Sequence, residues 1–296
     1  MSTIFVERLT SLDFSLLCPT RGLVGETWLV DIELTGALNS ESMVLDFGVT
    51  KKEIKAAVEL YADHVLLVPE YNSTVSLQRE AGGRLNVVMA LPAGGKIRCT
   101  APAGSIRPLP LTQVTAEGLK PLLEQLLMET LPASVEAVAI TLTPQTIDGA
   151  WYHYSHGLKK HNGACQRIAH GHRSALRLYV DGRRRPDLEE RQCEQWRDIY
   201  IATADDLLNS QTLDNHLHHI FAYHAPEGYF ELQLPAARCY LLSTDTTVEQ
   251  IAAHLAAKWG EQFPQNHIKV VAYEGVGKGA VSESCASVAA DVQADT

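Results

Sequence analysis

The elements expected from the sequence run twice through one order, with a break at the turn-forming pair Asp148-Gly149. Alternating and helical apolar periods predict, before the break, strands at 27–34, 84–91 and 135–142 and helices at 51–61 and 115–127. After the break they predict strands at 173–180, 229–234, 238–242 and 268–273 and helices at 194–208 and 248–259. The 296 residues suffice for two domains of ordinary size. We therefore expect one domain at 1–147, a second of similar fold at 148–284 and a loose tail at 285–296.

Charge and apolar patterning exclude several classes of partner. The formal net charge is −10 and the only dense basic run is at 183–185, so the chain lacks the basic face that nucleic acid requires. No segment approaches the roughly 20 apolar residues that a membrane helix needs, and the first residues do not resemble a secretion signal. The six cysteines are scattered without a CxxC pair, which argues against a disulfide framework. We expect a cytoplasmic protein with reduced cysteines.

Five of the twelve histidines lie within residues 152–174. Side chains two residues apart on a strand point to the same face, so His170 and His172 can present two imidazoles to one ion. A third imidazole from a preceding strand would complete a catalytic zinc site whose fourth position is open. His156 is the candidate for that ligand, with His153 or His161 as the alternatives.

A cysteine in a glycine-flanked loop, Cys165, precedes His170 by a short segment. A thiol held near a divalent cation loses its proton readily and can then act as a base or a nucleophile. Taken alone, a His-x-His pair also arises by chance, and a lone cysteine is commonly a small buried apolar residue. The two features together favour a metal-dependent enzyme.

Four short motifs follow one another in the second half of the chain. They are Ser155-His156 at a strand end, Cys165 ahead of His170-Gly171-His172, Thr246-Thr247 with Glu249 at a helix start, and Tyr273-Glu274 at a strand end. In type and order they resemble the motifs of 6-pyruvoyl-tetrahydropterin synthases and of the related 6-carboxy-tetrahydropterin synthases of queuosine synthesis. In the first half, residues 43–54 and 62–67 resemble the family's Asp-Phe segment and its Asp-His pair.

The resemblance implies an α+β fold made of two tandem tunnelling-fold repeats, each an antiparallel sheet with two helices on one face, which assemble into a homo-oligomer. It implies one Zn²⁺ held by His156, His170 and His172 of the second repeat. The first repeat would bind no zinc, because residues 21–28 stand where His-Gly-His belongs and Leu142 stands where the closing glutamate belongs.

The family's Asp-His pair has two candidates in this chain. In the second repeat His218-His219 would replace it, which makes His219 one candidate. The other is Asp63-His64 of the first repeat, completing the zinc site of the second repeat within the chain or across a subunit contact. The residues leave both candidates open.

The resemblance also implies a chemistry: a carbon-oxygen or carbon-carbon lyase acting on 7,8-dihydroneopterin triphosphate or a related pterin. Cys165 would be the general base and the Asp-His pair would relay protons. Glu274 would accept two parallel hydrogen bonds from the aminopyrimidine edge of the ring. Thr246 and Thr247 would add hydrogen bonds to the ring, although helix capping explains them equally well.

Two other functions fit the same residues. One is a zinc enzyme that acts on a substrate other than a pterin, with the same three ligands. The other is a binding module that keeps the fold without the chemistry. Pterin turnover distinguishes the proposed enzyme from both, and a metal assay distinguishes either enzyme from the module.

Overall fold

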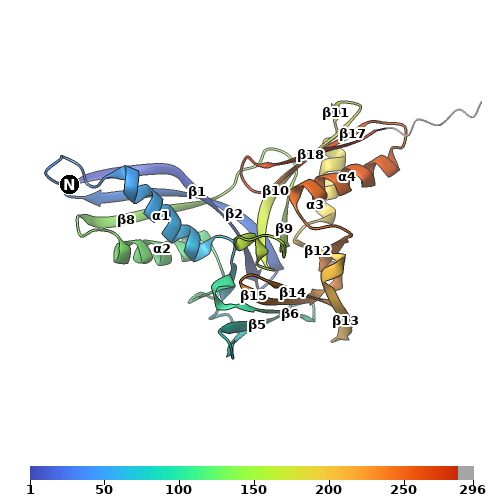
Figure 1. Cartoon of the computed structure of the whole chain (residues 1–296), viewed down its shortest axis with the longest axis horizontal. Coiled ribbons are helices and arrows are strands. Elements are labelled where there is room, and N and C mark those ends of the chain that lie inside the picture. Colours follow the sequence, from blue (N-terminus) through green and yellow to red (C-terminus); the bar gives the residue numbers. More distant parts are fainter. Residues whose placement is uncertain (286–296) are drawn as a thin grey trace, which may run out of the picture.

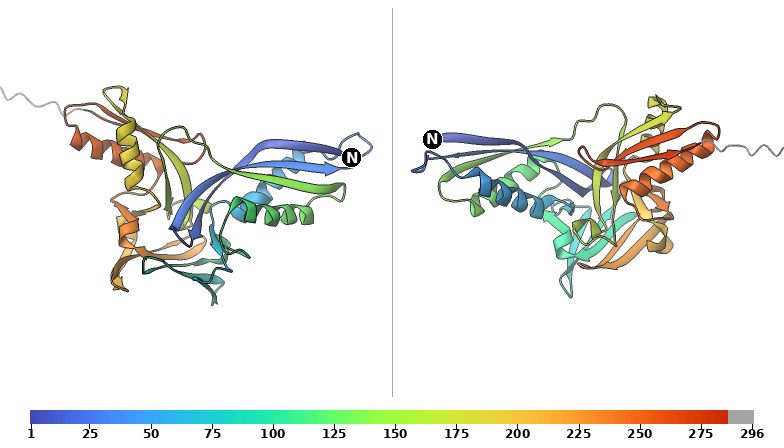
Figure 2. Two further views of the ribbon diagram at one scale, coloured as in Figure 1. Left: turned by 180° about the vertical axis from the view of Figure 1, so that it is seen from behind. Right: turned by 45° about the horizontal axis from the view of Figure 1, so that its top comes forward.

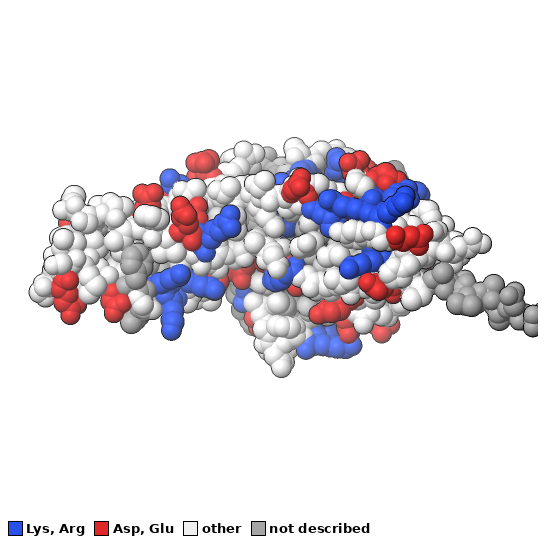
Figure 3. Space-filling model, turned by 90° about the horizontal axis from the view of Figure 1, so that it is seen from above, with Lys and Arg blue, Asp and Glu red and all other residues white. Residues whose placement is uncertain are grey.

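A computed structural model describes residues 1–285, apart from the side chains of Phe47 and Val49. The fold is mixed α+β, with mainly antiparallel sheets and four α-helices in this part of the chain (Figure 1). Most of the expected tail lies outside the described residues. No helix within residues 1–285 combines the length and the apolar character needed to cross a membrane. Basic and acidic side chains are interspersed over the face drawn in Figure 3.

The first repeat is a five-stranded sheet in the order β7-β3-β1-β2-β8, covered by two helices. Its strands are β1 (Ser2–Cys18), β2 (Gly22–Gly36), β3 (Leu66–Pro69), β7 (Ile106–Leu109) and β8 (Val135–Pro144). Its helices are α1 (Phe47–Ala62) and α2 (Ala116–Thr130), which lie on the same side of the long strands (Figure 1). Three leucines spaced four residues apart on α2, at 119, 123 and 127, are fully buried. They lie in one apolar cluster with residues of α1 and of the sheet.

The second repeat has the sheet order β16-β12-β9-β10-β17-β18, with the short β11 (Arg183–Arg184) paired to β10. Its other strands are β9 (Trp151–His156), β10 (His170–Val180), β12 (Ile199–Thr203), β16 (Cys239–Leu242), β17 (Ile268–Tyr273) and β18 (Gly279–Ser284). Its helices are α3 (Pro186–Gln195) and α4 (Val248–Gln262). The side chains of Thr115 and Thr247 accept from backbone N–H groups at the starts of α2 and α4, so capping, one of the two explanations offered for the Thr246-Thr247 pair, holds for Thr247.

A third sheet joins the two repeats in the order β13-β14-β15-β6-β5-β4. Its strands are β4 (Val75–Glu80), β5 (Arg84–Ala90), β6 (Lys96–Pro102), β13 (Leu207–Leu213), β14 (His216–Ala225) and β15 (Gly228–Pro235). Each repeat contributes one half, and antiparallel pairing of β6 with β15 connects them. Both views of Figure 2 show this sheet as a layer beneath the other two.

The five strands of the first repeat's sheet correspond in order to β16, β12, β9, β10 and β17 of the second. In the first, Ser15 of β1 pairs with Leu66 and with Gly25, and in the second, Ser155 of β9 pairs with Tyr200 and with Gly171. The parallel pairs β3–β7 and β12–β16 continue the match. Ser15 is therefore equivalent to Ser155, and Gly25 to Gly171, which fixes the equivalence of the residues around them.

These equivalent residues meet where the repeats touch. The hydroxyl oxygens of Ser15 and Ser155 lie 2.7 Å apart and both side chains are fully buried. A Cβ atom on either Gly25 or Gly171 would overlap the carbonyl oxygen of Tyr154. Only glycine allows this approach of the two backbones.

The predicted helix at 194–208 is wrong. Helix α3 ends at Gln195, and the following residues form β12 and the start of β13. The sequence of β12, IYIAT, suits a buried strand, and its parallel pairing with β9 and β16 overrides the local helical period. The long strand β1 was not predicted at all.

Candidate active site

The three predicted ligands lie together on one face of the β9–β10 pair. His156 is the last residue of β9 and is paired with His170, the first residue of β10, and His172 follows two positions later on the same face. All three side chains are fully buried. One nitrogen from each lies within 4.8 Å of the others, so this group can hold a metal ion.

Hydrogen bonds fix the protons of two of these rings. The Nδ1 atom of His156 lies 2.9 Å from the carbonyl oxygen of Thr246, and that of His170 lies 2.9 Å from the carbonyl oxygen of Arg167. A carbonyl oxygen only accepts, so both Nδ1 atoms carry hydrogen and both Nε2 atoms present lone pairs. Burial, followed by the neighbouring imidazoles, lowers the pKa of both rings well below the ordinary value, which keeps them neutral.

The spacing of the nitrogens fits tetrahedral zinc. The Nε2 atoms of His156 and His172 lie 3.3 Å apart. Two ligands at Zn–N distances of about 2.0–2.1 Å in a tetrahedral site stand roughly 3.3–3.4 Å apart. The two rings can share one hydrogen across this contact, or both Nε2 atoms can present lone pairs to a cation between them. The residues therefore fit a divalent cation with an open fourth position.

Glu274 lies beside this group, directly after β17. Its Oε1 atom is 3.9 Å from Nε2 of His156 and 3.8 Å from Nε2 of His172. The backbone N–H of Glu274 donates to the carbonyl oxygen of Lys278, which closes the turn leading to β18. The carboxylate is part-exposed, at 21 % of its side-chain surface, so a ligand at the metal position would reach it.

The first repeat reaches into this site through Asp63 and His64, which follow α1. The Nδ1 atom of His64 donates to Asp63 at 2.7 Å, and the other carboxylate oxygen of Asp63 accepts from the backbone N–H of Asp13 at 2.8 Å. The His64 ring centroid lies 5.0 Å from that of His170. His64 has a φ of 52°, a left-handed conformation that sharply turns the chain between α1 and β3.

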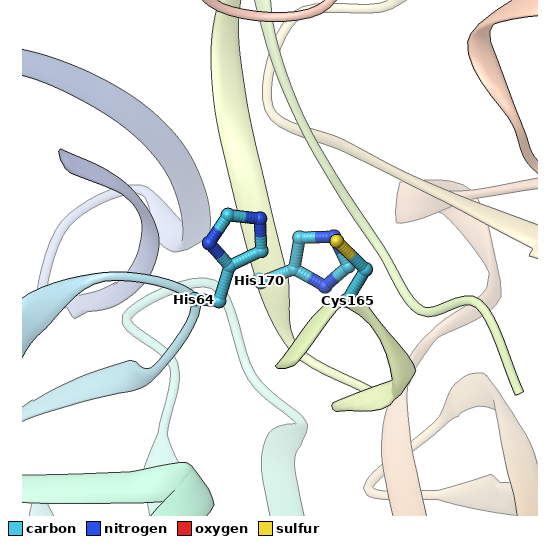
Figure 4. Close-up of side chains that lie close together, drawn as sticks. All are labelled: His64, Cys165 and His170. Carbon is cyan, nitrogen blue, oxygen red and sulfur yellow. The ribbon is translucent and has the colours of Figure 1, made fainter. Parts of the chain in front are cut away.

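Cys165 completes a second group with His64 and His170, whose ligand atoms lie within 4.8 Å of one another (Figure 4). Burial opposes the charged form of His64, but hydrogen bonds to Asp63 and Cys165 outweigh it and raise the pKa of His64 to about 10. Of the two candidates for the Asp-His pair, the structure brings Asp63-His64 to the histidine group, and within one chain.

The loop that carries Cys165 is anchored to the third sheet. The carbonyl oxygen of Gln166 accepts from the hydroxyl of Tyr223, and the side-chain amide oxygen of Gln166 accepts from the backbone N–H of Glu227. Arg167 forms two hydrogen bonds to the Glu227 carboxylate, at 2.9 and 3.2 Å. Arg167 also donates to the carbonyl oxygen of His64 at 3.3 Å, which ties the cysteine loop to the first repeat.

The other candidate histidines lie elsewhere. His219 is on β14, where its Nδ1 atom lies 2.8 Å from the hydroxyl of Ser210, and His218 accepts from the backbone N–H of Lys96. The strand register aligns the Asp63-His64 pair with 197–198 and not with His218-His219, which corrects the expected correspondence. Neither of the two alternative ligands, His153 and His161, belongs to a metal-capable group of the described residues.

The two threonines have local partners. The hydroxyl of Thr246 lies 3.2 Å from Nδ1 of His156 and its carbonyl oxygen accepts from the same ring, so Thr246 orients a ligand. Thr247 caps α4.

The equivalent positions in the first repeat carry no imidazole. By the register of the serines and glycines, Leu16, Val24 and Glu26 stand where the second repeat has its three histidines. Leu142 pairs with Val30 as Ala272 pairs with Leu176, so the counterpart of Glu274 is Pro144. The expectation from the sequence, Leu142, is wrong by two residues.

Sequence reasoning missed Asp13 of β1. Its Oδ1 atom lies 3.2 Å from Nδ1 of His172, it accepts from the Thr27 hydroxyl at 2.5 Å, and Oδ2 lies 3.6 Å from Nζ of Lys278. Burial raises the pKa of Asp13, but these three partners outweigh it and lower the pKa to about 2. The signal in the sequence was an acid within the otherwise apolar run LDFSLL.

Fold and site together define an α+β protein of two like repeats, with a three-histidine group that can hold a metal at their junction. Residues 145–285 match the model of the 6-pyruvoyl tetrahydropterin synthase family. No curated protein matches the sequence.

Several solved structures are similar to part of the chain. A 6-pyruvoyl tetrahydropterin synthase from Plasmodium vivax is 18% identical with a TM-score of 0.40, covering 50% of this chain and 93% of that chain. A catalytic-residue mutant of the P. vivax protein is 20% identical with a TM-score of 0.39, covering 48% and 90%. The Plasmodium falciparum protein is 16% identical with a TM-score of 0.39, covering 49% and 98%.

Proposed function

We propose that the chain is a zinc-dependent lyase of the 6-pyruvoyl-tetrahydropterin synthase type, acting on 7,8-dihydroneopterin triphosphate or a closely related pterin. The observation that carries the proposal is the convergence of three imidazole nitrogens beside Cys165 and His64, two of them left unprotonated by hydrogen bonds on the opposite ring nitrogen. The match of residues 145–285 to the family model supplies the substrate class.

His156, His170 and His172 would hold the metal, which when bound acts as a Lewis acid toward side-chain hydroxyls of the substrate. The fixed Nδ1 hydrogen bonds hold the rings of His156 and His170 before any ligand arrives. Little reorganisation is then needed during the reaction.

Cys165 removes a proton from the substrate side chain as the general base. His64 lies beside the thiol, and Asp63 holds His64 in place through the 2.7 Å hydrogen bond. His64 then returns a proton to the carbon or oxygen that needs it. In this arrangement Cys165 is the base, His64 orients it, and Asp63 holds His64.

Glu274 orients the substrate. A carboxylate can accept two parallel hydrogen bonds from an amine and a ring N–H, which is the pattern of the aminopyrimidine edge of a pterin. Its position within 4 Å of two ligand nitrogens keeps the ring next to the metal group.

Binding a triphosphate would need a basic side chain that is not already paired with an acid. The four basic residues nearest the site in sequence all face acids: Lys159 with Asp206, Lys160 with Asp245, Arg167 with Glu227 and Arg173 with Glu26. None of these four stands ready as a phosphate ligand without exchanging its partner.

Assembly into a homo-oligomer is part of the same proposal. Strands β8 and β18 end the sheets of the two repeats, and within residues 1–285 each has one side without a paired strand. Exposed strand edges favour pairing with another chain. Light scattering on the purified protein would show a mass above that of one chain.

The deciding experiment incubates the zinc-loaded protein with 7,8-dihydroneopterin triphosphate and identifies the product by mass. The proposal expects 6-pyruvoyl- or 6-carboxy-tetrahydropterin, no product from Cys165→Ala, and unchanged turnover by Cys18→Ala, which alters a part-buried cysteine of the first repeat. Zinc binding without any pterin product would point to another substrate. Absence of zinc would point to a binding module.

A further inference from the structure

His172 differs from the other two ligands in what faces its Nδ1 atom. His156 and His170 each donate to a backbone carbonyl oxygen, which fixes the ring without help from another side chain. The Nδ1 atom of His172 is buried without a hydrogen-bond partner among the described residues, and Oδ1 of Asp13 stands 3.2 Å from it. Both side chains are almost completely buried, with 1 % and 4 % of their surface exposed.

Asp13 cannot easily turn away from this position. The hydroxyl of Thr27 donates to its Oδ1 atom at 2.5 Å, and Nζ of Lys278 lies 3.6 Å from its Oδ2 atom. Gly275, with a φ of 67°, packs so closely that a Cβ atom there would stand 2.6 Å from Oδ1. The carboxylate is therefore held from the first repeat by Thr27 and from the β17–β18 turn by Gly275 and Lys278.

We propose that Asp13 is a positioning residue for the metal site: it holds His172 in the form with hydrogen on Nδ1, so that Nε2 faces the metal. The inference rests on the proposed zinc-dependent function. A carboxylate behind a ligand histidine fixes its ring and makes it a better donor. The first repeat, which has no ligands of its own, thus contributes to metal affinity as well as to proton transfer.

The other half of the molecule contains the same pair with its members exchanged. The equivalent of Asp13 is His153, and the equivalent of His172 is Glu26. The Nδ1 atom of His153 lies 3.8 Å from Oε2 of Glu26, and both side chains are buried. The exchange leaves an acid and a histidine facing each other in both halves, but only one half has the two further histidines that complete a metal site. Glu26 therefore provides a matched control for Asp13.

The test measures zinc affinity by competition with a chelator, for the wild-type chain and for Asp13→Ala, Asp13→Asn and Glu26→Gln. Loss of a carboxylate behind a ligand weakens metal binding by roughly 10–100-fold, which is the result expected for Asp13→Ala. Asp13→Asn should lose less, because its amide oxygen can still accept from Nδ1. Glu26→Gln should bind zinc as the wild type does.

Two further readouts separate positioning from loss of structure. Thermal melting of the metal-free proteins shows whether each variant is folded, and the absorption spectrum of the Co²⁺-substituted protein reports ligand geometry. If Asp13→Ala fails to fold, Asp13→Asn and Thr27→Val, which keeps the carboxylate but removes its hydrogen bond, carry the test.

The outcomes also separate this inference from the proposed function. Wild-type zinc affinity and an unchanged cobalt spectrum in both Asp13 variants would overturn the role of Asp13 and leave the pterin enzyme standing. Zinc binding that depends on Asp13 in a protein without pterin turnover would overturn the enzyme and leave Asp13 standing. A wild-type chain that binds no zinc would overturn both.

Discussion

The hydroxyl groups of Ser15 and Ser155 lie 2.7 Å apart at equivalent positions of the two repeats. Around this contact the two halves have the same backbone arrangement and different side chains. On one side three histidines converge, and on the other Leu16, Val24 and Glu26 replace them. The Asp63-His64 turn of the first repeat lies on the histidine side, so residues of both repeats meet there within a single chain.

His170 belongs to both metal-capable groups, so its removal should have the largest effect. His170→Ala is expected to reduce bound zinc from about one per chain to near zero, because two imidazoles rarely retain catalytic zinc. Metal analysis of the purified protein measures this directly. His161→Ala changes a histidine of the 157–163 loop outside both groups and should retain its zinc. Equal loss in both variants would contradict the assigned ligands.

Asp63 should matter for turnover but not for metal content. An asparagine cannot accept from both Nδ1 of His64 and the backbone N–H of Asp13 through two oxygens, so His64 loses its orientation. Asp63→Asn is expected to lower kcat by about 10²–10⁴-fold, the usual contribution of general acid–base groups. Steady-state kinetics with zinc analysis would check this. Full activity in Asp63→Asn, or a comparable loss in His219→Ala, would favour the rival histidine.

Mixing two inactive variants tests whether the site lies within one chain. Asp63→Asn and His170→Ala each damage a different half of the same site. If each site draws on a single chain, as the structure has it, co-expressed oligomers of the two variants should stay inactive. Recovery of a substantial fraction of wild-type turnover would show that Asp63-His64 serves a neighbouring chain.

Gly25 should be among the least replaceable residues. The Cβ atom of alanine would overlap the carbonyl oxygen of Tyr154, which belongs to the other repeat and cannot move without disturbing β9. Gly25→Ala is expected to lower the free energy of unfolding by about 1–3 kcal/mol or more. Gly104→Ala is the control, because nothing lies within 4 Å of a Cβ atom at that position. Chemical denaturation of both variants measures the difference, and equal stabilities would contradict the close contact.

The folded protein should lose stability in acid because His153 is buried. Burial, followed by the charges of Arg21 and Arg173, lowers the pKa of His153 from 6.5 to about 3. Between these values the unfolded chain binds the proton and the folded chain does not. The contribution of His153 to the free energy of unfolding is therefore complete above pH 6.5. It declines as the pH falls toward 3, by up to about 1.4 kcal/mol per pH unit.

The variant His153→Gln keeps a donor for the carbonyl oxygen of Gly25, with which Nδ1 of His153 now pairs at 2.6 Å. Its free energy of unfolding should decline less steeply than that of the wild type between pH 7 and pH 5. Urea titrations at several pH values, with zinc present throughout, measure the two slopes. Parallel slopes would show that His153 is not buried in neutral form.

Periodicity and short motifs predicted the parts of the molecule that local sequence controls. The helices at α2 and α4 followed from apolar spacing, and the shared face of His170 and His172 followed from strand alternation. Strand β1 did not, because its sequence mixes charged and apolar residues and contains a bulge between Val6 and Thr10. The alternation of buried and exposed side chains along β1 depends on its pairing with β2 and β3.

The cross-repeat part of the site depends on contacts far apart in the sequence. Asp13 and His172 are brought together only by the packing of β1 and β2 against β10, and His64 points to the site through a left-handed turn. A sequence pattern records neither relationship. The motif Asp63-His64 could be recognised, but the choice between it and His218-His219 needed the strand register.

The most direct test of the metal site is anomalous diffraction at the zinc absorption edge from crystals of the zinc-loaded protein. One peak per chain is expected, about 2.0–2.1 Å from the Nε2 atoms of His156, His170 and His172. A peak between His64, Cys165 and His170, or no peak at either group, would contradict the assignment of the three histidines as the metal site.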